Sequence, residues 1–366
     1  MNYRRLLIQD LPQARGLWEV SFNDPTTFID WYFAERFPSD QVRGLFQDGR
    51  LLCMAQAVPY RFFLRSQWVP TVYIIGLATD PKARGEGLAT KLLQNILSEF
   101  HQQGLGMTIL MPAVPLFYQR RGWEYLYSLQ KIDFIPSEAT QTLGRLESSS
   151  SIDPFVLNTL YQQTFQGAHG RLDRTDHDWQ ALLYDYAMDG GDVFFYRDRN
   201  NDRRGYILCQ MTPERIKIRE LAIKDERLLI DALGLLARLS PGRPMEWQAW
   251  TGQRFPYRPL DHTIKPVAMA RIVNLKHMLE SIQFPPHFEM NFSFSIFDPL
   301  LQYNCDTYRW HVHHGLVDLL PIPDNPSYPQ FTIGDLTTWV MGEYRDIPPE
   351  LAQALPKTQN YMNDLF

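Results

Sequence analysis

The stretch that decides the fold is GLATDPKARGEGLATKLL, residues 76–93. It follows an apolar strand and opens a helix, predicted over Leu88–Phe100, whose apolar residues recur at helical spacing. Glycines let consecutive backbone N–H groups approach one point, and the helix start adds the positive end of its dipole. The pattern predicts an anion site suited to a pyrophosphate, although alone it also fits an ordinary strand–turn–helix junction. The predicted site residues are Arg84, Gly85, Glu86, Gly87, Leu88 and Ala89.

The elements on either side of this loop predict a mixed sheet with helices. Before the loop, helices are expected over residues 11–22 and 28–37, and strands over 3–8, 44–47, 51–59, 61–64 and 71–78. After its helix, a strand is expected over 107–111, a helix or turn over 115–121 and a strand over 123–134. Asp10 is expected to cap the first helix.

A polar linker at residues 147–151 precedes a second part with a similar order of elements. Helices are expected there over 154–165, 176–186 and 225–239, and strands over 192–197, 205–211 and 215–223. From residue 266 a helix is expected over 268–282, strands over 291–297 and 308–312, and a short helix or turn over 334–341. These changes in character, with the length of the chain, predict three domains: 1–148, 149–265 and 266–366.

A second motif, LMPAVPLFYQRRGWEYL at residues 110–126, places an aromatic–Tyr segment before a basic pair and a Gly–aromatic pair. With the loop of residues 76–93, in this order and at this spacing, it resembles the two signatures of the GNAT acetyltransferases. MARIVNLKHMLESI (269–282) and FSFSIFDPLLQYN (292–304) extend the likeness over essentially the whole chain. The chain resembles the Eis (enhanced intracellular survival) family and its bacterial relatives.

This resemblance implies the fold class and the assembly. The expected class is α/β (α+β), with two tandem GNAT-like mixed-sheet domains and a C-terminal α+β domain that resembles a sterol carrier protein. The second GNAT-like domain is expected to be degenerate, because no glycine loop is present around residues 223–227. The family also implies a homo-oligomer, with a hexamer as one expected form.

The resemblance further implies an N-acetyltransferase that moves the acetyl group directly from acetyl-CoA to a primary amine. The backbone of Leu77, Ala78 and Thr79 is expected to bind the pantetheine arm and polarise the thioester carbonyl. Tyr118 is the expected general acid, since a thiol has a pKa of about 8.5 and a tyrosine one of about 10. The alternative is that Tyr118 only packs beside the co-substrate.

The family also implies that the C-terminal carboxylate, here that of Phe366, reaches the active site of the first domain and acts as base. An aromatic last residue would help to bury the chain end, and burial would raise the pKa of the carboxylate. The alternative is a frayed tail, which is the usual state of a terminus.

Residues for the acceptor are suggested by position. Phe22, Asp24 and Trp31 fall where the family's first helices line the acceptor cleft, and aromatics with an acid suit a cationic amine. Helix packing and a cap would explain them equally well. Two interpretations also stay open for Lys82 and for the pair Arg120–Arg121: these residues either contact phosphate groups or are solvated surface residues.

Composition excludes some classes of function. The net charge is −5 without a basic stripe, so nucleic acid is not an expected partner. Three dispersed cysteines fit a reducing compartment, and no apolar run reaches the roughly 18 residues of a membrane helix. Without a signal-peptide pattern, a cytoplasmic location and no membrane partner are expected. His311 and His313 would share one face of a strand, but no second ligand pair at zinc-site spacing follows, so no metal is expected.

The expected acceptor is a small cationic amine, aminoglycoside-like or polyamine-like. One alternative is a lysine or N-terminus of a protein. Another is a non-catalytic protein that binds an apolar ligand in its third domain. The intact loop at 84–89 and Tyr118 favour a catalyst over a binding protein.

Overall fold

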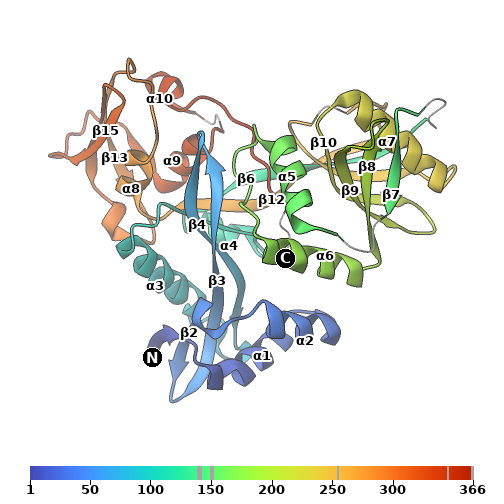
Figure 1. Cartoon of the computed structure of the whole chain (residues 1–366). Coiled ribbons are helices and arrows are strands. Elements are labelled where there is room, and N and C mark those ends of the chain that lie inside the picture. Colours follow the sequence, from blue (N-terminus) through green and yellow to red (C-terminus); the bar gives the residue numbers. More distant parts are fainter. Residues whose placement is uncertain (138–141, 149–151, 254, 344–345, 364–366) are drawn as a thin grey trace. The chain divides into compact units, whose positions relative to one another are not determined.

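The computed structural model describes residues 1–137, 142–148, 152–253, 255–343 and 346–363 (Figure 1). The chain contains two compact units. Unit 1 combines Met1–Leu126 with Ala268–Thr358, and unit 2 combines Tyr127–Val267 with Gln359–Phe366. The expected division into three domains stays a prediction.

Unit 1 is built on a mixed sheet with strand order β1-β2-β3-β4-β5-β12. Neighbouring strands are antiparallel except for the parallel pair β4–β5. The strands are β1 (Asn2–Arg5), β2 (Val42–Gln47), β3 (Arg50–Leu64), β4 (Gln67–Thr79), β5 (Met107–Leu110) and, from Ala268 onward, β12 (Asp261–Ile272). The helices are α1 (Leu11–Glu19), α2 (Thr26–Glu35), α3 (Leu88–Gln102) and α4 (Pro115–Gln119), with 3₁₀ turns at Ile8–Asp10, Ser39–Gln41 and Pro81–Ala83.

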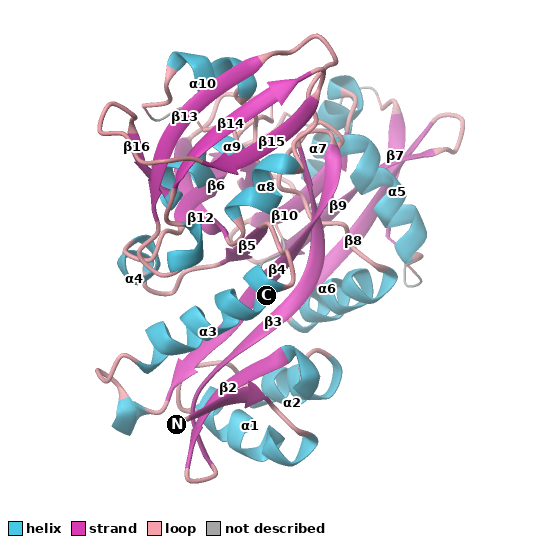
Figure 2. Cartoon of the chain, turned by 90° about the vertical axis from the view of Figure 1, so that its left-hand side faces the viewer, coloured by secondary structure: helices cyan, strands magenta, loops and turns pink. Residues whose placement is uncertain are grey.

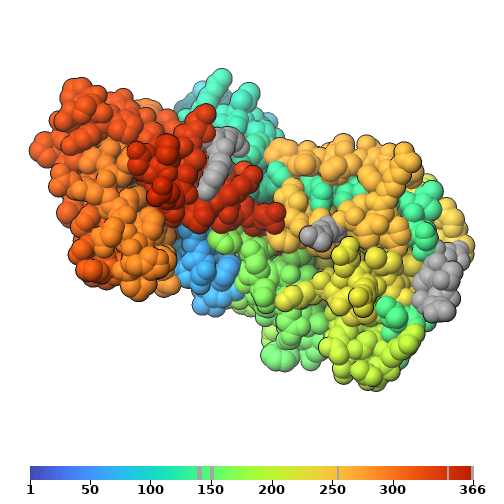
Figure 3. Space-filling view, turned by 90° about the horizontal axis from the view of Figure 1, so that it is seen from above, coloured from blue at the N-terminus to red at the C-terminus, as the bar shows by residue number. Residues whose placement is uncertain are grey.

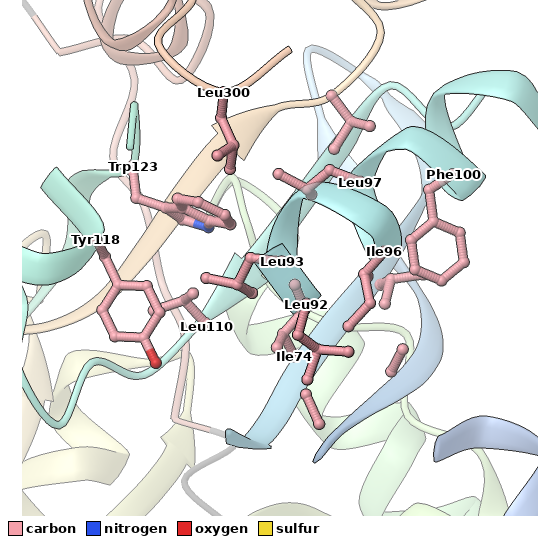
Figure 4. Close-up of a cluster of buried hydrophobic side chains, with 14 of the residues drawn as sticks. Ile74, Leu92, Leu93, Ile96, Leu97, Phe100, Leu110, Tyr118, Trp123 and Leu300 are labelled. Atoms are coloured by element: carbon pink, nitrogen blue, oxygen red, sulfur yellow. The ribbon is translucent and has the colours of Figure 1, made fainter. Parts of the chain in front are cut away.

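Helices cover both faces of this sheet. Side chains alternate between faces along a strand, so Cys53 and Ala55 of β3 pack with α3, whereas Met54 packs with α1 and α2. The predicted apolar stripe of α3 is confirmed: Leu92, Leu93, Ile96 and Leu97 are all fully buried. Figure 4 shows these side chains pointing into one cluster with Leu110, Trp123 and Leu300. Each such burial stabilises the fold by roughly 1.5–3 kcal/mol.

Unit 1 has a second, four-stranded sheet in the C-terminal part of the chain, in the order β15-β14-β13-β16 (Figure 2). Its strands are β13 (Met290–Phe297), β14 (Thr307–His313), β15 (Leu316–Pro321) and β16 (Gln330–Thr332). The accompanying helices are α8 (Leu275–Glu280), α9 (Ile333–Val340) and α10 (Pro349–Ala354), with a 3₁₀ turn at Gln302–Asn304. The likeness of this region to a sterol carrier protein stays a prediction.

The helix expected over residues 268–282 is wrong in its first half. There β12 pairs with β5, placing Met269 opposite Leu110, and the helix begins only at Leu275. The Asn274 side chain caps it by accepting from the His277 N–H at 2.9 Å. A short apolar run buried on both sides has no periodicity that separates strand from helix, and sheet pairing decided the outcome.

Asp10 is the N-cap residue of α1 as expected, but its side chain makes no capping hydrogen bond to this helix. Its carboxylate accepts from the Leu7 N–H at 2.7 Å and from Arg4 at 2.6 Å. An ion pair with a neighbouring strand therefore outcompetes the local cap.

Unit 2 is also built on a sheet, with strand order β6-β11-β10-β9-β8-β7, and Figure 3 shows its residues gathered in one body. The strands are, from Tyr127 onward, β6 (Glu124–Phe134), then β7 (Gly144–Ser148), β8 (Gly191–Asp198), β9 (Arg203–Met211), β10 (Ile216–Ile223) and β11 (Met245–Trp250). The helices are α5 (Pro154–Phe165), α6 (Asp176–Met188) and α7 (Glu226–Leu239). The side chain of Asp225 caps α7 where unit 1 has glycine at the corresponding helix start. The expected mixed α/β class is confirmed.

A buried polar network holds the last described residues inside unit 2. Arg174 and Glu220 form a two-pronged ion pair at 2.8 and 2.9 Å, and both side chains are almost completely buried. The hydroxyls of Tyr206 and Tyr361 donate to the same carboxylate at 2.6 and 2.7 Å. Burial alone would raise the pKa of Glu220, but the Arg174 charge and these hydrogen bonds hold it below its usual value.

Among the described residues, no helix has both the length and the apolar character needed to cross a membrane.

Candidate active site

The candidate site begins where two parallel strands of unit 1 part. The ladder joins Thr71–Ile74 of β4 to Met107–Leu110 of β5 and stops there. Beyond it, β4 continues to Thr79, still paired with β3 on its other edge. Backbone groups of the segment Leu77–Thr79 therefore face an opening in the sheet. An extended amide-bearing arm such as pantetheine can pair with groups of this kind.

The loop after β4 has the backbone that its glycines were predicted to allow. Gly85 and Gly87 take φ values of +85° and +75°, a region that side chains disfavour. Gly87 is the N-cap of α3, and no side chain of a described residue caps the N–H groups of the first turn. Arg84 is fixed by a hydrogen bond from Nε to the Thr79 carbonyl at 3.2 Å. Open N–H groups, a helix dipole and a cation together suit a diphosphate.

A pocket of about 490 Å³ lies over this opening and loop. No Asp or Glu is among its described lining residues, so nothing there opposes a polyanion. The predicted residues on its wall are Leu77, Ala78, Thr79, Arg84, Gly85, Gly87, Leu88 and Ala89. Glu86 belongs to the loop but is not part of the wall. These residues fit the diphosphate and arm of acetyl-CoA.

Tyr118 lies on α4, buried in the apolar cluster that includes α3, and it is not among the described residues that line this pocket. Its ring meets Trp123 edge-on at 5.8 Å, and Figure 4 shows it beside Leu110 at the end of β5. Burial, followed by the nearby Cys53 thiol, raises the pKa of Tyr118 to about 12, against the effect of the Arg121 charge. The phenol is therefore protonated at neutral pH, as a proton donor must be. The Cys53 thiol also contacts the Thr79 hydroxyl, at 3.2 Å, on the strand that lines the pocket.

The two arginines after Tyr118 differ in their surroundings. Arg121 lines the pocket and donates from Nε to the Thr90 hydroxyl at 3.1 Å and from Nη1 to the Phe117 carbonyl at 2.5 Å. Its guanidinium also lies 3.8 Å from the Phe117 ring. Burial and the charge of Arg120 lower the pKa of Arg121. Arg120 is exposed, and its guanidinium makes no hydrogen bond or ion pair with any residue that the structure describes.

Of the residues predicted for the acceptor, only Phe22 lines the pocket. Asp24 accepts from the Trp18 indole N–H at 2.8 Å, and the Trp18 ring packs on Phe22 at 4.6 Å. Trp31 contacts the rings of α2 instead. Their roles stay predictions, but the structure groups Phe22 and Asp24 around Trp18 and leaves Trp31 apart.

Sequence reasoning missed several wall residues. Ser21, Thr90, Ala113 and Phe117 line the pocket. The Ser21 hydroxyl is buried and has no hydrogen-bond partner among the described residues, so it is available to a ligand. Thr90 follows the predicted anion loop directly, and Ala113 and Phe117 lie within the second motif at residues 110–126. Ser21 belongs to neither motif.

The predicted base cannot be placed. Phe366 lies outside the described residues, so its role stays a prediction.

A cluster of histidines lies on β14 and the turn after it. His313 and His314 come together there with Glu289, with one potential ligand atom from each within 4.8 Å of the others. The Glu289 carboxylate accepts a hydrogen bond from Nδ1 of His313 at 2.6 Å, and the rings of His311 and His313 stack with their centroids 5.8 Å apart.

Residues 2–126 match the family model described as an acetyltransferase (GNAT) domain. No curated protein sequence matches the chain significantly. Among the solved structures that share the fold over almost the whole chain, at low identity, are three bacterial proteins.

The first is a conserved protein from Enterococcus faecalis V583, described as a probable N-acyltransferase: 19% identity, 98% of this chain and 96% of that one, TM-score 0.85. The second is a GCN5-related N-acetyltransferase from Anabaena variabilis: 21% identity, 98% and 94%, TM-score 0.79. The third is Eis1 from Mycobacterium abscessus: 16% identity, 99% of both chains, TM-score 0.76.

The loop, the parted strands and the family match define residues 2–126 as a GNAT acetyltransferase domain. The protein is an acyltransferase, and this domain implies the use of acetyl-CoA.

Proposed function

We propose that the protein transfers the acetyl group of acetyl-CoA directly to a primary amine of a small cationic molecule, of aminoglycoside or polyamine type. One observation carries the proposal. A single acid-free pocket joins the open edge of β4, the Arg84–Ala89 loop and the ring of Phe22. It offers sites for the arm, the diphosphate and an acceptor in one space.

The reaction forms a C–N bond and breaks the C–S bond of the thioester. Backbone N–H groups at the open edge of β4 hydrogen-bond the thioester oxygen as negative charge develops on it. Phe22 provides an aromatic face toward which a cationic amine is attracted. The diphosphate is held by the loop and Arg84, which fixes the position of the thioester.

Tyr118 supplies the proton for the leaving sulfur. With a pKa of about 12 against about 8.5 for a thiol, complete transfer is uphill by roughly 5 kcal/mol. The hydroxyl therefore acts first as a hydrogen-bond donor to the developing thiolate. The C-terminal carboxylate of Phe366 is proposed to accept the proton that the attacking amine loses.

The test is thiol release from acetyl-CoA with a panel of aminoglycosides, polyamines and lysine peptides. Tyr118→Phe is expected to lower kcat by roughly 10²–10⁴-fold, the usual size of general acid catalysis, with little change in KM for acetyl-CoA. Deleting Phe366 is expected to lower kcat to a similar degree. Full activity in both variants would remove the assigned acid and base.

The panel also separates the acceptor classes. Turnover of lysine peptides without turnover of small amines would replace the proposed acceptor by a protein. Failure of the wild type to bind acetyl-CoA would overturn the proposed function. A cytoplasmic location and a homo-oligomer stay predictions from the sequence.

A further inference from the structure

A second pocket of about 450 Å³ adjoins the first in unit 1. Both are lined by Thr90, Phe117 and Arg121, so the two spaces meet beside the first turn of α3. The second pocket is completed by Val114, Leu116, Arg120, Pro299 and Leu300. No part of the reaction described above uses this space.

The walls of the second pocket combine exposed apolar surface with positive charge. Val114 and Leu116 are 60% and 64% exposed, which is high for large apolar side chains outside an interface. Arg120 and Arg121 are close enough for the charge of one to lower the pKa of the other. No Asp or Glu is among the described lining residues. Two cations beside apolar surface suit a ligand with a flat apolar ring and an anionic group.

A buried ion pair connects the two sides of this pocket, which are the end of α4 and the loop of residues 298–301. Arg271 pairs with Asp298, and both side chains are completely buried. Arg271 Nε also donates to the Arg121 carbonyl at 2.8 Å, and the Asp298 carboxylate accepts from the Leu300 and Leu301 N–H groups, both at 2.9 Å. The pair therefore fixes the end of α4 against the loop of residues 298–301.

We propose that this second pocket binds the 3′-phosphoadenosine end of acetyl-CoA and that Arg120 recognises the 3′-phosphate. The inference rests on the proposed function, because it requires the diphosphate in the first pocket. From there the molecule has only its ribose, adenine and 3′-phosphate left to place. The adenine lies against Leu116 and Pro299, and the unengaged guanidinium of Arg120 pairs with the phosphate.

The proposal makes the C-terminal part of the chain a wall of the acetyl-CoA site. Pro299 and Leu300 stand far beyond the GNAT match at residues 2–126, and the Gln94 side chain of α3 donates to the Leu300 carbonyl at 3.3 Å. Selectivity for the phosphorylated co-substrate would then depend on Arg120, while the loop at 298–301 provides shape.

The test compares CoA with 3′-dephospho-CoA, which differ only in that phosphate, by calorimetric dissociation constants on the full-length protein. The wild type is expected to bind CoA roughly tenfold more tightly, the effect of one charge-assisted contact. In Arg120→Gln this preference is expected to disappear through weaker binding of CoA alone, and Arg120→Lys is expected to retain part of it. Raising the salt concentration should reduce the preference, since Arg120 is exposed.

Arg84→Gln is the matched control, because both ligands carry the diphosphate and both should bind more weakly by a similar factor. Equal binding of the two ligands by the wild type, or a loss in Arg120→Gln that is the same for both, would overturn the inference while leaving the proposed function intact. Failure of the wild type to bind either ligand would instead remove the proposed function.

Discussion

The hydroxyl of Tyr361 allows a direct test of how the last described residues are held in unit 2. It donates to the Glu220 carboxylate at 2.7 Å, and its ring stacks on Phe165 at 4.2 Å with only 9° between the planes. Tyr361→Phe keeps the stacked ring and removes one hydrogen bond to a buried, charged acceptor. Glu220 retains its contacts with Arg174 and Tyr206, so the ion pair itself should survive.

A hydrogen bond to a charged group contributes about 1.5–3 kcal/mol, and Tyr361→Phe should cost that much. For a unit of this size each kcal/mol lowers the melting temperature by roughly 2–4 °C, so the expected loss is about 3–12 °C. The measurement is calorimetric melting of the full-length protein, with hydrogen exchange on β10 to show that the loss lies in unit 2.

The matched control is Tyr186→Phe. The Tyr186 hydroxyl is also buried in unit 2, but it has no hydrogen-bond partner among the described residues. Its removal should be neutral or slightly stabilising, since it eliminates an unsatisfied polar group. Equal stability of the two variants would refute the reasoning, because the Tyr361 hydroxyl would then contribute nothing through Glu220.

Three further predictions concern unit 1. Gly76→Ala should destabilise it by about 2–4 kcal/mol in urea unfolding, because Gly76 has a φ of +62° and a Cβ there would lie 2.4 Å from the Trp18 ring. The control is Gly16→Ala, in the exposed part of α1, where a Cβ would have nothing within 4 Å and should stabilise the unit by up to about 1 kcal/mol. An equal effect of the two substitutions would contradict this explanation. Leu97→Ala should cost about 2–5 kcal/mol by the same measurement, since Leu97 is fully buried, and a cost below 1 kcal/mol would mean that α3 is loosely packed. Burial alone would raise the pKa of Glu99, but hydrogen bonds from Arg43 and Tyr3 hold it at about 2; the resulting stability is present above pH 4.5 and lost as the pH falls toward 2, so wild type and Glu99→Gln should converge in melting temperature across that range.

Local signals were reliable where the residues themselves set the backbone. The stripe of Leu92, Leu93, Ile96 and Leu97 predicted α3, and the glycines at 85 and 87 predicted the left-handed loop that precedes it. Both depend on interactions within a few residues, which a single sequence contains in full.

The sequence could not predict what distant segments decide. Ala268–Ile272 became a strand because β5 offered it a partner more than 150 residues earlier. Strand β3 continues to Leu64 because β4 pairs with it from Cys53 onward. The contacts of Arg121 with Thr90 and of Arg271 with Asp298 likewise join residues with no common motif. The pocket walls at Ser21 and Pro299 escaped prediction for the same reason.

Because β5 pairs with β12, the sheet of unit 1 is completed late in the synthesis of the chain. The GNAT match ends at residue 126, but the sheet of unit 1 lacks its last strand until residue 272 has been synthesised, and the wall at Pro299 follows later still. At typical ribosomal rates of about 5–20 residues per second, a nascent chain holds the uncovered edge of β5 for roughly 8–32 s. During that interval an open strand edge is prone to pair with other chains. Expression of residues 1–126 alone would make that interval permanent.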